Sequence, residues 1–439
     1  MKNISIWSWW LVGLLLVVMS GCSTAKNNDA GFSSSDDEVS DDDAAWDDDS
    51  SADDDANPND DAVVDDDTVL DDDLTPDDDI IPDDDATPDD DTIPDDDTVP
   101  DDDIVTDDDT APDDDTTPEE YRYSIKVDNM TMADVIAQLP IFVERGLDLF
   151  LNIRPWDIND DLLELLSQAA EQNVPVKIWP LLDWDDGSWG CEDDLDLFIA
   201  NVLATVDFIS AVDNNVEWVI LNMELGHPKI DQLEQYFADG DWVAIIELLL
   251  ADRDRELFQE NLTKMQVLLD ELHDRGFKVQ SSTYPYVLDD LPDGDPDIQD
   301  IADIPLSGLN WDNWGFNPYT TEYSAYMPAL LGPDFVYSYA SSAFGGFGSH
   351  SEITVGIVPT ADEVGYTTLE AFAADVAAAK AAGIKWIGVY HLNGILSQED
   401  PDAWFDALET PPAQPAPQAL IGLLRGGIMT ADWMLDFIP

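Results

Sequence analysis

Residues 119–410 alternate short apolar runs with amphipathic or Ala-rich stretches, and this alternation predicts an α/β fold of the (β/α)8 TIM-barrel type. Eight runs have strand character, at 123–127, 149–153, 176–182, 216–223, 278–283, 306–310, 353–358 and 386–392. The runs are continuously apolar, as parallel strands covered by helices are. A span of about 290 residues is also the size of one such barrel.

Helical patterns lie between these runs, at 132–145, 160–172, 194–212, 256–275, 322–331 and 368–382. Several end in glycine before the next strand, as at Gly146, Gly276 and Gly383, which is the usual signal for a helix C-cap. A doubly wound open sheet is the alternative. It is disfavoured because the segment after the first strand, residues 127–130, contains none of the glycines of a phosphate-binding loop.

Residues 1–21 have the pattern of an export signal. Lys2 precedes an apolar run at 11–19, which is too short for a membrane-spanning helix. The following Met19-Ser20-Gly21-Cys22 resembles a bacterial lipobox, so we expect Cys22 to be lipidated and to anchor the chain in a membrane. The alternative is an ordinary secretory signal with an incidental cysteine. Cys191 is the only other cysteine, so acylation of Cys22 leaves no pair for an intrachain disulfide.

Residues 22–118 are expected to be a disordered tether. Asp triplets recur every six residues from 41 to 113, with Asn59 replacing one Asp, and are separated by spacers such as Thr-Ile-Pro. Half of each unit is Asp and Pro recurs, so the repeats cannot form the apolar core of a solenoid. A calcium loop is also disfavoured, because the units lack the turn glycine and the bidentate Glu. Self-repulsion extends such a chain into a spacer.

Net charge excludes several partners. The whole chain carries −82, of which −42 belongs to residues 119–439. Nucleic-acid binding through a basic groove is therefore excluded, and electrostatic attraction to anionic lipid headgroups is disfavoured. So few Lys residues on a folded domain indicate a saline habitat, where salt screens the repulsion. After Glu409, residues 411–439 comprise a Pro-rich turn and an apolar segment, which we expect to pack on the barrel rather than bind a partner.

Function in such a barrel lies at the C-terminal ends of the strands. Glu224 follows the fourth apolar run, where burial could raise its pKa into the range of a general acid. The alternative is that Glu224 has no function and is one of many surface Glu residues in an acidic domain. Three Asp residues at other predicted strand ends are candidates for a second catalytic carboxylate, although Asp also opens turns and caps helices: Asp183, Asp185 and Asp312.

Aromatic rings accompany these carboxylates, and rings of this kind stack on sugar faces. Carboxylates and rings at one barrel mouth are typical of glycoside chemistry, in which two carboxyl groups divide the acid role from the base or nucleophile role. The candidate substrate-binding residues are Asn222, Trp184, Trp189, Tyr284, Trp311, Trp314 and His391. We expect no metal or other cofactor, because the four His residues are scattered and no metal-ligand spacing occurs. No Gly-x-Ser-x-Gly elbow of an esterase is present either.

Four segments, 176–187, 217–226, 284–290 and 385–396, resemble an uncharacterised group of bacterial lipoproteins with a glycosidase-like (β/α)8 barrel. In that group the third strand leads into Asp-Gly-x-Trp and the fourth ends in Asp-x-Glu. The latter motif is distantly similar to that of chitinase-like and lysozyme-like barrel hydrolases. The resemblance implies that Glu224 is the acid. Asn222 stands where the motif has Asp; it can orient Glu224 by a hydrogen bond but cannot share a proton.

Two hypotheses follow from the sequence. The first is a membrane-tethered glycoside hydrolase, monomeric and extracytoplasmic, on the outer membrane or cell surface, that acts on a polysaccharide or envelope glycan. The second is a non-catalytic carbohydrate-binding or scaffold lipoprotein on a degenerate hydrolase barrel. In the second, binding depends on the Trp residues and not on Glu224.

Overall fold

The protein is described here from a computed structural model that covers residues 120–439, except 213, 252, 293, 327–330, 362 and 436–439. The side chains of a few further residues, Asp185 among them, are not described. The described residues do not include the export signal, the lipidation site Cys22 or the Asp-rich tether, so these stay predictions.

Eight parallel strands close into a barrel in the order β1 to β8, which confirms the predicted (β/α)8 fold. Closure is made by β1 and β8, where Lys126 is in register with Tyr390. The strands are β1 (Arg122–Val127), β2 (Asp148–Ile153), β3 (Val176–Pro180), β4 (Val216–Met223), β5 (Lys278–Thr283), β6 (Asn313–Phe316), β7 (Ser351–Gly356) and β8 (Trp386–Tyr390).

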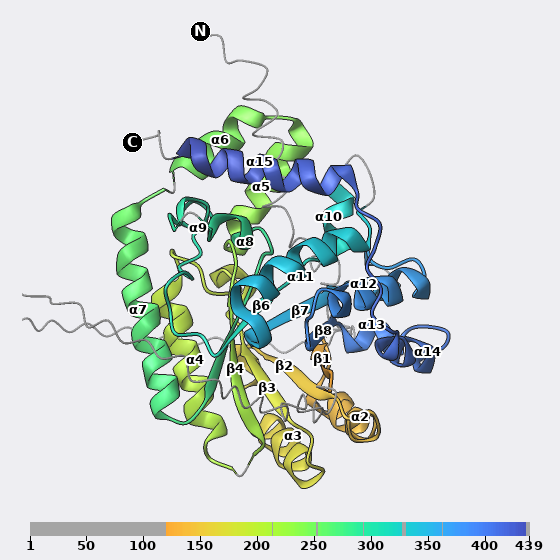
Figure 1. Cartoon of the computed structure of the whole chain (residues 1–439). Coiled ribbons are helices and arrows are strands. Elements are labelled where there is room, and N and C mark those ends of the chain that lie inside the picture. Colours follow the sequence, from red (N-terminus) through yellow and green to blue (C-terminus); the bar gives the residue numbers. More distant parts are fainter. Residues whose placement is uncertain are drawn as a thin grey trace, which may run out of the picture. The chain divides into compact units, whose positions relative to one another are not determined.

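Helices surround the strands, with α4 and α7 along one side of the barrel and α11 and α12 along another (Figure 1). The α-helices are α2 (Met132–Arg145), α3 (Asp160–Glu171), α4 (Leu195–Ile209), α5 (His227–Asp239), α6 (Trp242–Ala251), α7 (Arg255–Asp274), α8 (Val287–Asp290), α9 (Asp297–Ile301), α10 (Thr320–Tyr326), α11 (Pro333–Phe347), α12 (Leu369–Ala381), α13 (Leu392–Leu396), α14 (Pro401–Asp406) and α15 (Ala419–Leu435). Short 3-10 turns are η2 (Pro155–Asp157), η3 (Trp184–Asp186), η4 (Gly348–His350) and η5 (Ala407–Glu409). No helix among the described residues is long and apolar enough to cross a membrane.

Local capping explains where the well-predicted helices begin and end. The Thr131 hydroxyl accepts a hydrogen bond from the Asp134 amide at the start of α2. Gly146 ends that helix with φ of 63°, a left-handed conformation that glycine adopts without strain. Asp254 caps α7 by accepting from the amides of Glu256 and Leu257.

The sixth strand is not where the sequence predicted it. Residues 306–310 form a turn, in which Gly308 has φ of 78° and the ring nitrogen of Trp311 donates to the Leu306 carbonyl. Leu306 is apolar because it is buried beneath this turn, not because it lies in the sheet. The strand runs instead over β6, where a Cβ on Gly315 would lie 2.5 Å from the Ser281 carbonyl of β5. Glycine is needed there for close contact between the strands.

Helices α5, α6 and α11 were not predicted, and the apolar C-terminal segment forms α15. That helix packs against α8, α9 and α11. Arg425 attaches it, because its guanidinium donates to Asp289 of α8 and, over 3.0 Å, to the Ser338 carbonyl of α11.

The barrel interior contains a polar layer formed by the odd-numbered strands: Ser124, Lys177, Gln280 and Glu352. The ammonium of Lys177 lies 2.5 Å from the Glu352 carboxylate, and both side chains are 1% exposed. Burial alone would raise the pKa of Glu352, but the charge and hydrogen bond of Lys177 outweigh it, so the pKa is lowered. Layers of four side chains from alternate strands are the rule in such barrels, and they are usually aliphatic.

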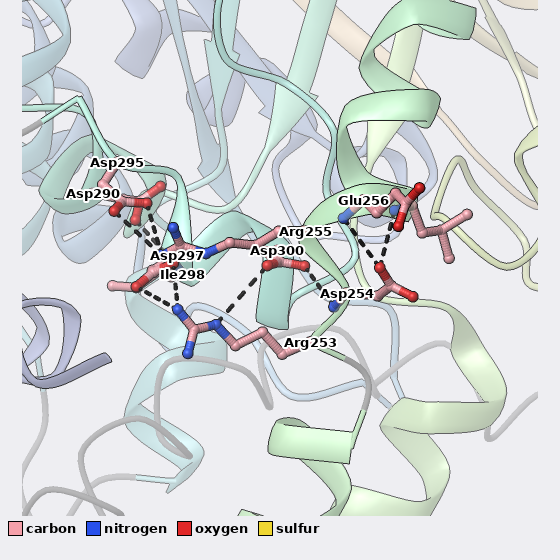
Figure 2. A network of polar contacts seen from close by, with 10 residues as sticks. Arg253, Asp254, Arg255, Glu256, Asp290, Asp295, Asp297, Ile298 and Asp300 are labelled. Carbon is pink, nitrogen blue, oxygen red and sulfur yellow. Dashed lines mark hydrogen bonds and ion pairs between the residues drawn. The ribbon is translucent and has the colours of Figure 1, made fainter. Parts of the chain in front are cut away.

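A second polar network ties the segment before α7 to the loop around α9, as Figure 2 shows. The Arg253 guanidinium contacts both carboxylate oxygens of Asp297, at 2.9 and 3.0 Å. The backbone amide of Asp254 donates to Asp300, and Arg255 pairs with Asp295 and Asp297. These contacts compensate three acidic side chains: Asp295, Asp297 and Asp300.

Candidate active site

A pocket opens at the C-terminal ends of the strands, where the fold predicts the functional site. Its walls come from the ends of β1 to β4 and β6 to β8 and from the segments that follow these strands. The residues that line it are Lys126, Asp128, Arg154, Trp179, Leu181, Trp184, Trp189, Asn222, Glu224, Asn317, Tyr319, Glu322, Ile357 and Tyr390.

Glu224 lies in this pocket and is 3% exposed. It is the first residue after β4, and its position is fixed by the loop that follows β3. The Gly190 amide donates to the Asn222 carbonyl, and the Glu224 amide donates to the Gly190 carbonyl. A side chain at 190 would meet Met223 and Phe198 at 2.9 Å, so this pairing requires glycine.

Asn317 holds the carboxyl group of Glu224. Its side-chain NH2 donates to Glu224 Oε1 over 3.2 Å and to the Ser282 hydroxyl over 3.2 Å. Its side-chain oxygen accepts from the ammonium of Lys126 over 3.1 Å. Because an ammonium can only donate, the amide oxygen must face Lys126 and the NH2 must face Glu224. The Lys126–Asn317 pair therefore makes Oε1 of Glu224 a hydrogen-bond acceptor.

Lys126 is itself enclosed by aromatic rings. Its ammonium lies 5.2 Å from the ring centre of Trp179 and 5.0 Å from that of Phe150, and the Tyr319 hydroxyl is 3.3 Å away. Ring faces attract a cation, so the charge can be retained at a site that is 1% exposed.

Asp128 is a second buried carboxylate in the pocket. It follows β1 and is 5% exposed. Its Oδ2 accepts from the Tyr390 hydroxyl over 2.7 Å, and its Oδ1 accepts from the amide of Asn152. Burial, and then the charge of Asp128, raise the pKa of Tyr390 well above its ordinary value, so this phenol stays a donor. Glu322, in the first turn of α10, is a third carboxylate in the pocket and is 2% exposed.

Three tryptophans form much of one wall. Trp184 and Trp189 pack edge to face at 6.3 Å, and both lie against His227. Trp189 is fixed through its ring nitrogen, which donates to the Leu225 carbonyl over 2.7 Å. Trp179, in β3, was not predicted as a binding residue because a strand Trp is usually part of the core.

Two buried polar atoms in the pocket have no hydrogen-bond partner among the described residues. One is a donor, Nε1 of Trp179, and the other is an acceptor, Oδ1 of Asn222. Almost all buried polar atoms in folded proteins are paired with protein or water.

The structure places some of the predicted site residues in the pocket and others outside it. Glu224, Asn222, Trp184 and Trp189 line the pocket. Asp312 does not: it precedes β6, and it bonds His273 of α7 over 2.9 Å and the Val279 amide near the start of β5. Asp312 therefore lies at the N-terminal end of the strands. The sequence placed it after the sixth strand, and this is wrong because that strand begins only at Asn313.

The remaining candidates lie outside the lining of this pocket. Trp311 and Trp314 flank the start of β6, and Trp314 stacks on Phe347 at 4.3 Å. Asp183 is half-buried before η3, and the side chain of Asp185 is outside the described residues. Tyr284 stacks on Tyr286 behind β5. His391 caps α13, and its Nε2 lies 3.1 Å from Glu363.

Sequence reasoning missed Lys126, Asp128, Asn317, Tyr319 and Glu322. Asp128 directly follows the first predicted strand, so the rule that found Glu224 could have found it. Asn317 and Glu322 were missed because the sixth strand was misplaced. No cluster of three or more His, Cys, Asp or Glu side chains in the described ranges is arranged to hold a metal.

No protein-family model matches the chain. No curated protein sequence matches it either. Among solved structures, an uncharacterized B. cereus protein is similar at 12% identity and a TM-score of 0.37, over 67% of this chain and 66% of that one. The glycoside hydrolase domain of PgaB (BpsB) from Bordetella bronchiseptica is similar at 11% identity and a TM-score of 0.40, over 66% and 99%.

A GH5_18 protein from Streptomyces cattleya in complex with Manb1-4GlcNAc is similar at 13% identity and a TM-score of 0.41, over 71% of this chain and 88% of that one. A chitinase from Rhizomucor miehei is matched as well, and so are a D-allulose 3-epimerase and an HMG-CoA lyase. Fold similarity of this extent does not select among their activities.

Proposed function

We propose that the barrel is a glycoside hydrolase in which Glu224 is the general acid. The observation that carries the proposal is the burial of Glu224 directly after β4, where the amide of Asn317 donates to Oε1 and fixes the orientation of the carboxyl group. Glu224 is buried in a pocket with aromatic walls at the mouth of the barrel. A buried carboxyl group held in one orientation is suited to protonate a glycosidic oxygen.

Asp128 is the proposed second carboxylate. Tyr390 and Asn152 donate to its two oxygens and hold the carboxylate in one orientation in the pocket. Glu322 lines the same pocket and is the other possibility. The sugar is proposed to bind against Trp184 and Trp189.

A second candidate function is favoured by one observation, the Asn222 side chain two residues before the acid. An amide cannot share a proton with Glu224 as a carboxyl group can, and its oxygen has no partner among the described residues. A carbohydrate-binding protein without hydrolytic activity would use the same pocket and the same tryptophans. Substitution of Glu224 would then leave glycan binding unchanged.

The decisive experiment compares wild type with Glu224→Gln on a series of defined polysaccharides, with released reducing ends as the measurement. General acid catalysis contributes about 10²–10⁴-fold, so a loss of at least about a hundredfold is expected. The matched control is Glu217→Gln, the same change at an exposed position of the same strand. Equal rates for wild type and Glu224→Gln, or no cleavage by wild type together with glycan binding, would favour the binding protein.

We also propose that the hydrolase is anchored outside the cytoplasm by a lipid on Cys22, with residues 23–118 as the spacer. The support is the sequence alone, since this segment lies outside the described residues. Labelling of cells with a fatty-acid analogue tests it: wild type should incorporate the label and sediment with membranes. Cys22→Ser should do neither, and label in that variant would contradict the anchor.

A further inference from the structure

Arg154 is a buried cation in the candidate active site. It follows β2, is 4% exposed and lines the same pocket as Glu224. Its guanidinium carbon lies 4.1 Å from the ring centre of Trp184 and 5.7 Å from that of Trp156. Arg154 is thus held between a tryptophan of the pocket wall and a tryptophan beside it.

The Arg154 side chain donates hydrogen bonds through only one of its nitrogens, and both acceptors are uncharged. Nη1 donates to the Leu182 carbonyl over 2.6 Å and, at 3.5 Å, to the Ser188 hydroxyl. A guanidinium has five N–H groups in a planar fork, so this leaves Nε and Nη2 for another acceptor. The backbone amide, not the side chain, is what binds Asp157.

No carboxylate among the described residues lies within 4.0 Å of the Arg154 guanidinium, and in this it differs from every other described arginine. The other six each make at least one ion pair within that distance: Arg122, Arg145, Arg253, Arg255, Arg275 and Arg425. In a domain with 56 acidic residues, a carboxylate is available almost everywhere. A buried arginine without one is the exception that requires an explanation.

Burial of an unpaired guanidinium is unfavourable, because a low-dielectric site disfavours charge. The cost shows as a lowered pKa of Arg154 through burial, which the charges of Asp128 and Asp183 only partly offset. An anion on the ligand would complete the pair. A carboxylate is the best match, since its two oxygens fit the planar fork and form two parallel hydrogen bonds.

Trp156 supplies the other half of a subsite. It lies in η2, two residues after Arg154, and is 54% exposed, unlike the buried rings of the core. An exposed indole at the C-terminal end of the barrel can stack on the apolar face of a pyranose. A sugar stacked there would present a carboxylate at its C6 to the neighbouring guanidinium.

We propose that Arg154 and Trp156 form a subsite for a uronic acid residue, whose carboxylate pairs with Arg154, so that the glycan is an acidic polysaccharide. The inference rests on the proposed function in that the ligand is a glycan. Long-range repulsion from the domain's charge of −42 does not exclude it. At 0.1 M salt, surface charges are screened beyond about 10 Å, whereas a contact pair in a buried pocket is screened much less.

The test measures binding to the full chain in detergent, with Glu224→Gln introduced so that the polymer is not cleaved. Polygalacturonate, alginate and hyaluronan oligosaccharides are titrated calorimetrically at 0.15 M NaCl. Each is compared with its carboxyl-reduced form, which keeps the linkages and removes the charge. Binding to at least one acidic glycan should be about tenfold to a hundredfold tighter than to its reduced form, as for a charged hydrogen-bonded pair.

Variants separate the two halves of the subsite. Arg154→Met should abolish the preference for the acidic form, Arg154→Lys should weaken it, and Trp156→Ala should weaken binding of both forms. Arg145→Met is the matched control, because Arg145 pairs with exposed carboxylates of α14. If Arg154→Met does not fold, the comparison of acidic with reduced glycan on the unaltered subsite decides alone.

Several outcomes would overturn the inference: equal affinity for acidic and reduced forms, no affinity for any of the uronates, tighter binding of sulfated neutral glycans, or an unaltered preference in Arg154→Met. Its failure is distinct from that of the proposed function. Cleavage of a neutral glycan that requires Glu224 would keep the hydrolase and refute the uronate subsite. Uronate binding that requires Arg154, without cleavage by wild type, would keep the uronate subsite and refute the hydrolase.

Discussion

Glu224 is placed by residues far from it in sequence. Asn317, which holds its carboxyl group, follows β6, and Lys126, which orients Asn317, lies in β1, 191 residues before it. The contribution of Lys126 is therefore indirect: its ammonium decides which end of the Asn317 amide faces the acid. This makes Lys126 and Asn317 positioning residues for the proposed acid.

Substitution of Lys126 tests this arrangement. In Lys126→Met the Asn317 amide is free to turn its oxygen toward Glu224, so we expect a loss of about tenfold to a hundredfold in kcat, the value of one hydrogen bond to a charged group. Asn317→Asp places a second carboxylate beside Glu224 and favours the protonated acid. The alkaline limb of the pH–rate profile should then move to higher pH, whereas a purely structural role would leave both limbs in place.

Glu192 is a buried carboxyl group outside the pocket, on the loop between β3 and α4. Burial, followed by the charges of Asp303 and Asp300, raises its pKa to about 8, while Asn261 and Lys229 act in the opposite direction. The folded-state pKa lies above the ordinary value of 4.5, so the fold binds a proton that the unfolded chain has lost. This contribution to stability is complete below pH 4.5 and is lost as the pH rises through 8.

The melting temperature is accordingly expected to fall between pH 5 and pH 9, and Glu192→Gln should reduce that fall. Glutamine is neutral at every pH and keeps the acceptor for Asn261, which bonds Glu192 over 3.3 Å. Thermal unfolding of both proteins across this range is the measurement. A pH dependence unchanged by the substitution would show that Glu192 is already ionised at neutral pH.

One layer inside the barrel is held by an ion pair instead of the usual aliphatic side chains. Lys177 of β3 and Glu352 of β7 meet across the interior, and both are 1% exposed. Lys177→Met should lower the free energy of unfolding by about 3–5 kcal/mol, because it leaves a buried carboxylate without its partner. Replacement of both, as Lys177→Met with Glu352→Leu, should recover much of that loss.

Urea unfolding of these variants gives the comparison. The control is Lys278→Met, which removes a pair with Glu217 in which both side chains are about half exposed and should cost about 0–1 kcal/mol. Similar losses for the buried and the exposed pair would mean that the interior layer does not depend on ionic contact.

Close contact between β5 and β6 depends on Gly315. Gly315→Ala would put a Cβ 2.5 Å from the Ser281 carbonyl, and we expect it to destabilise the fold by about 1–3 kcal/mol. Gly345→Ala is a control of opposite sign: it lies within α11 with no atom within 4 Å of the added carbon, so it should stabilise by about 0.5–1 kcal/mol. Equal effects of the two changes in chemical denaturation would refute this interpretation.

The same strand explains what sequence patterns miss at the scale of the element. Well-predicted elements have local signals, such as the apolar run of β4 and the caps at both ends of α2. Residues 306–310 have the apolar signal because they are buried under a turn, while β6 is four residues long and contains a glycine. From sequence alone, a buried apolar segment outside the sheet, such as 306–310, looks like a strand. A short strand with a weak apolar signal, such as β6, does not.

At the scale of the whole molecule, charge is the dominant property. Residues 119–439 carry 56 acidic and 14 basic side chains, and the arginines pair with only a fraction of the carboxylates. Self-repulsion of this size destabilises a folded state, and salt screens it. We expect the melting temperature to rise markedly between 0.05 and 1 M NaCl.

A neutral solute separates screening from the general effect of excluded cosolutes. Sucrose at matched osmolality should raise the melting temperature less than NaCl does, because it does not screen charge. A melting temperature that is flat in NaCl, or equal in both solutes, would contradict the expectation of a salt-adapted domain.

The sequence by itself determined the alternation of strands and helices, the barrel that follows from it, and the place of Glu224 at the end of a strand. These depend on periodicity, length and caps, which neighbouring residues encode. Tertiary structure decided which polar residues meet Glu224. Closure of the barrel brings Lys126, Asp128 and Asn317 into its pocket, and the register of β6 removes Asp312 from it. These residues come together only through strand order and register, which involve positions far apart in the chain. No local sequence pattern predicts which of them will meet.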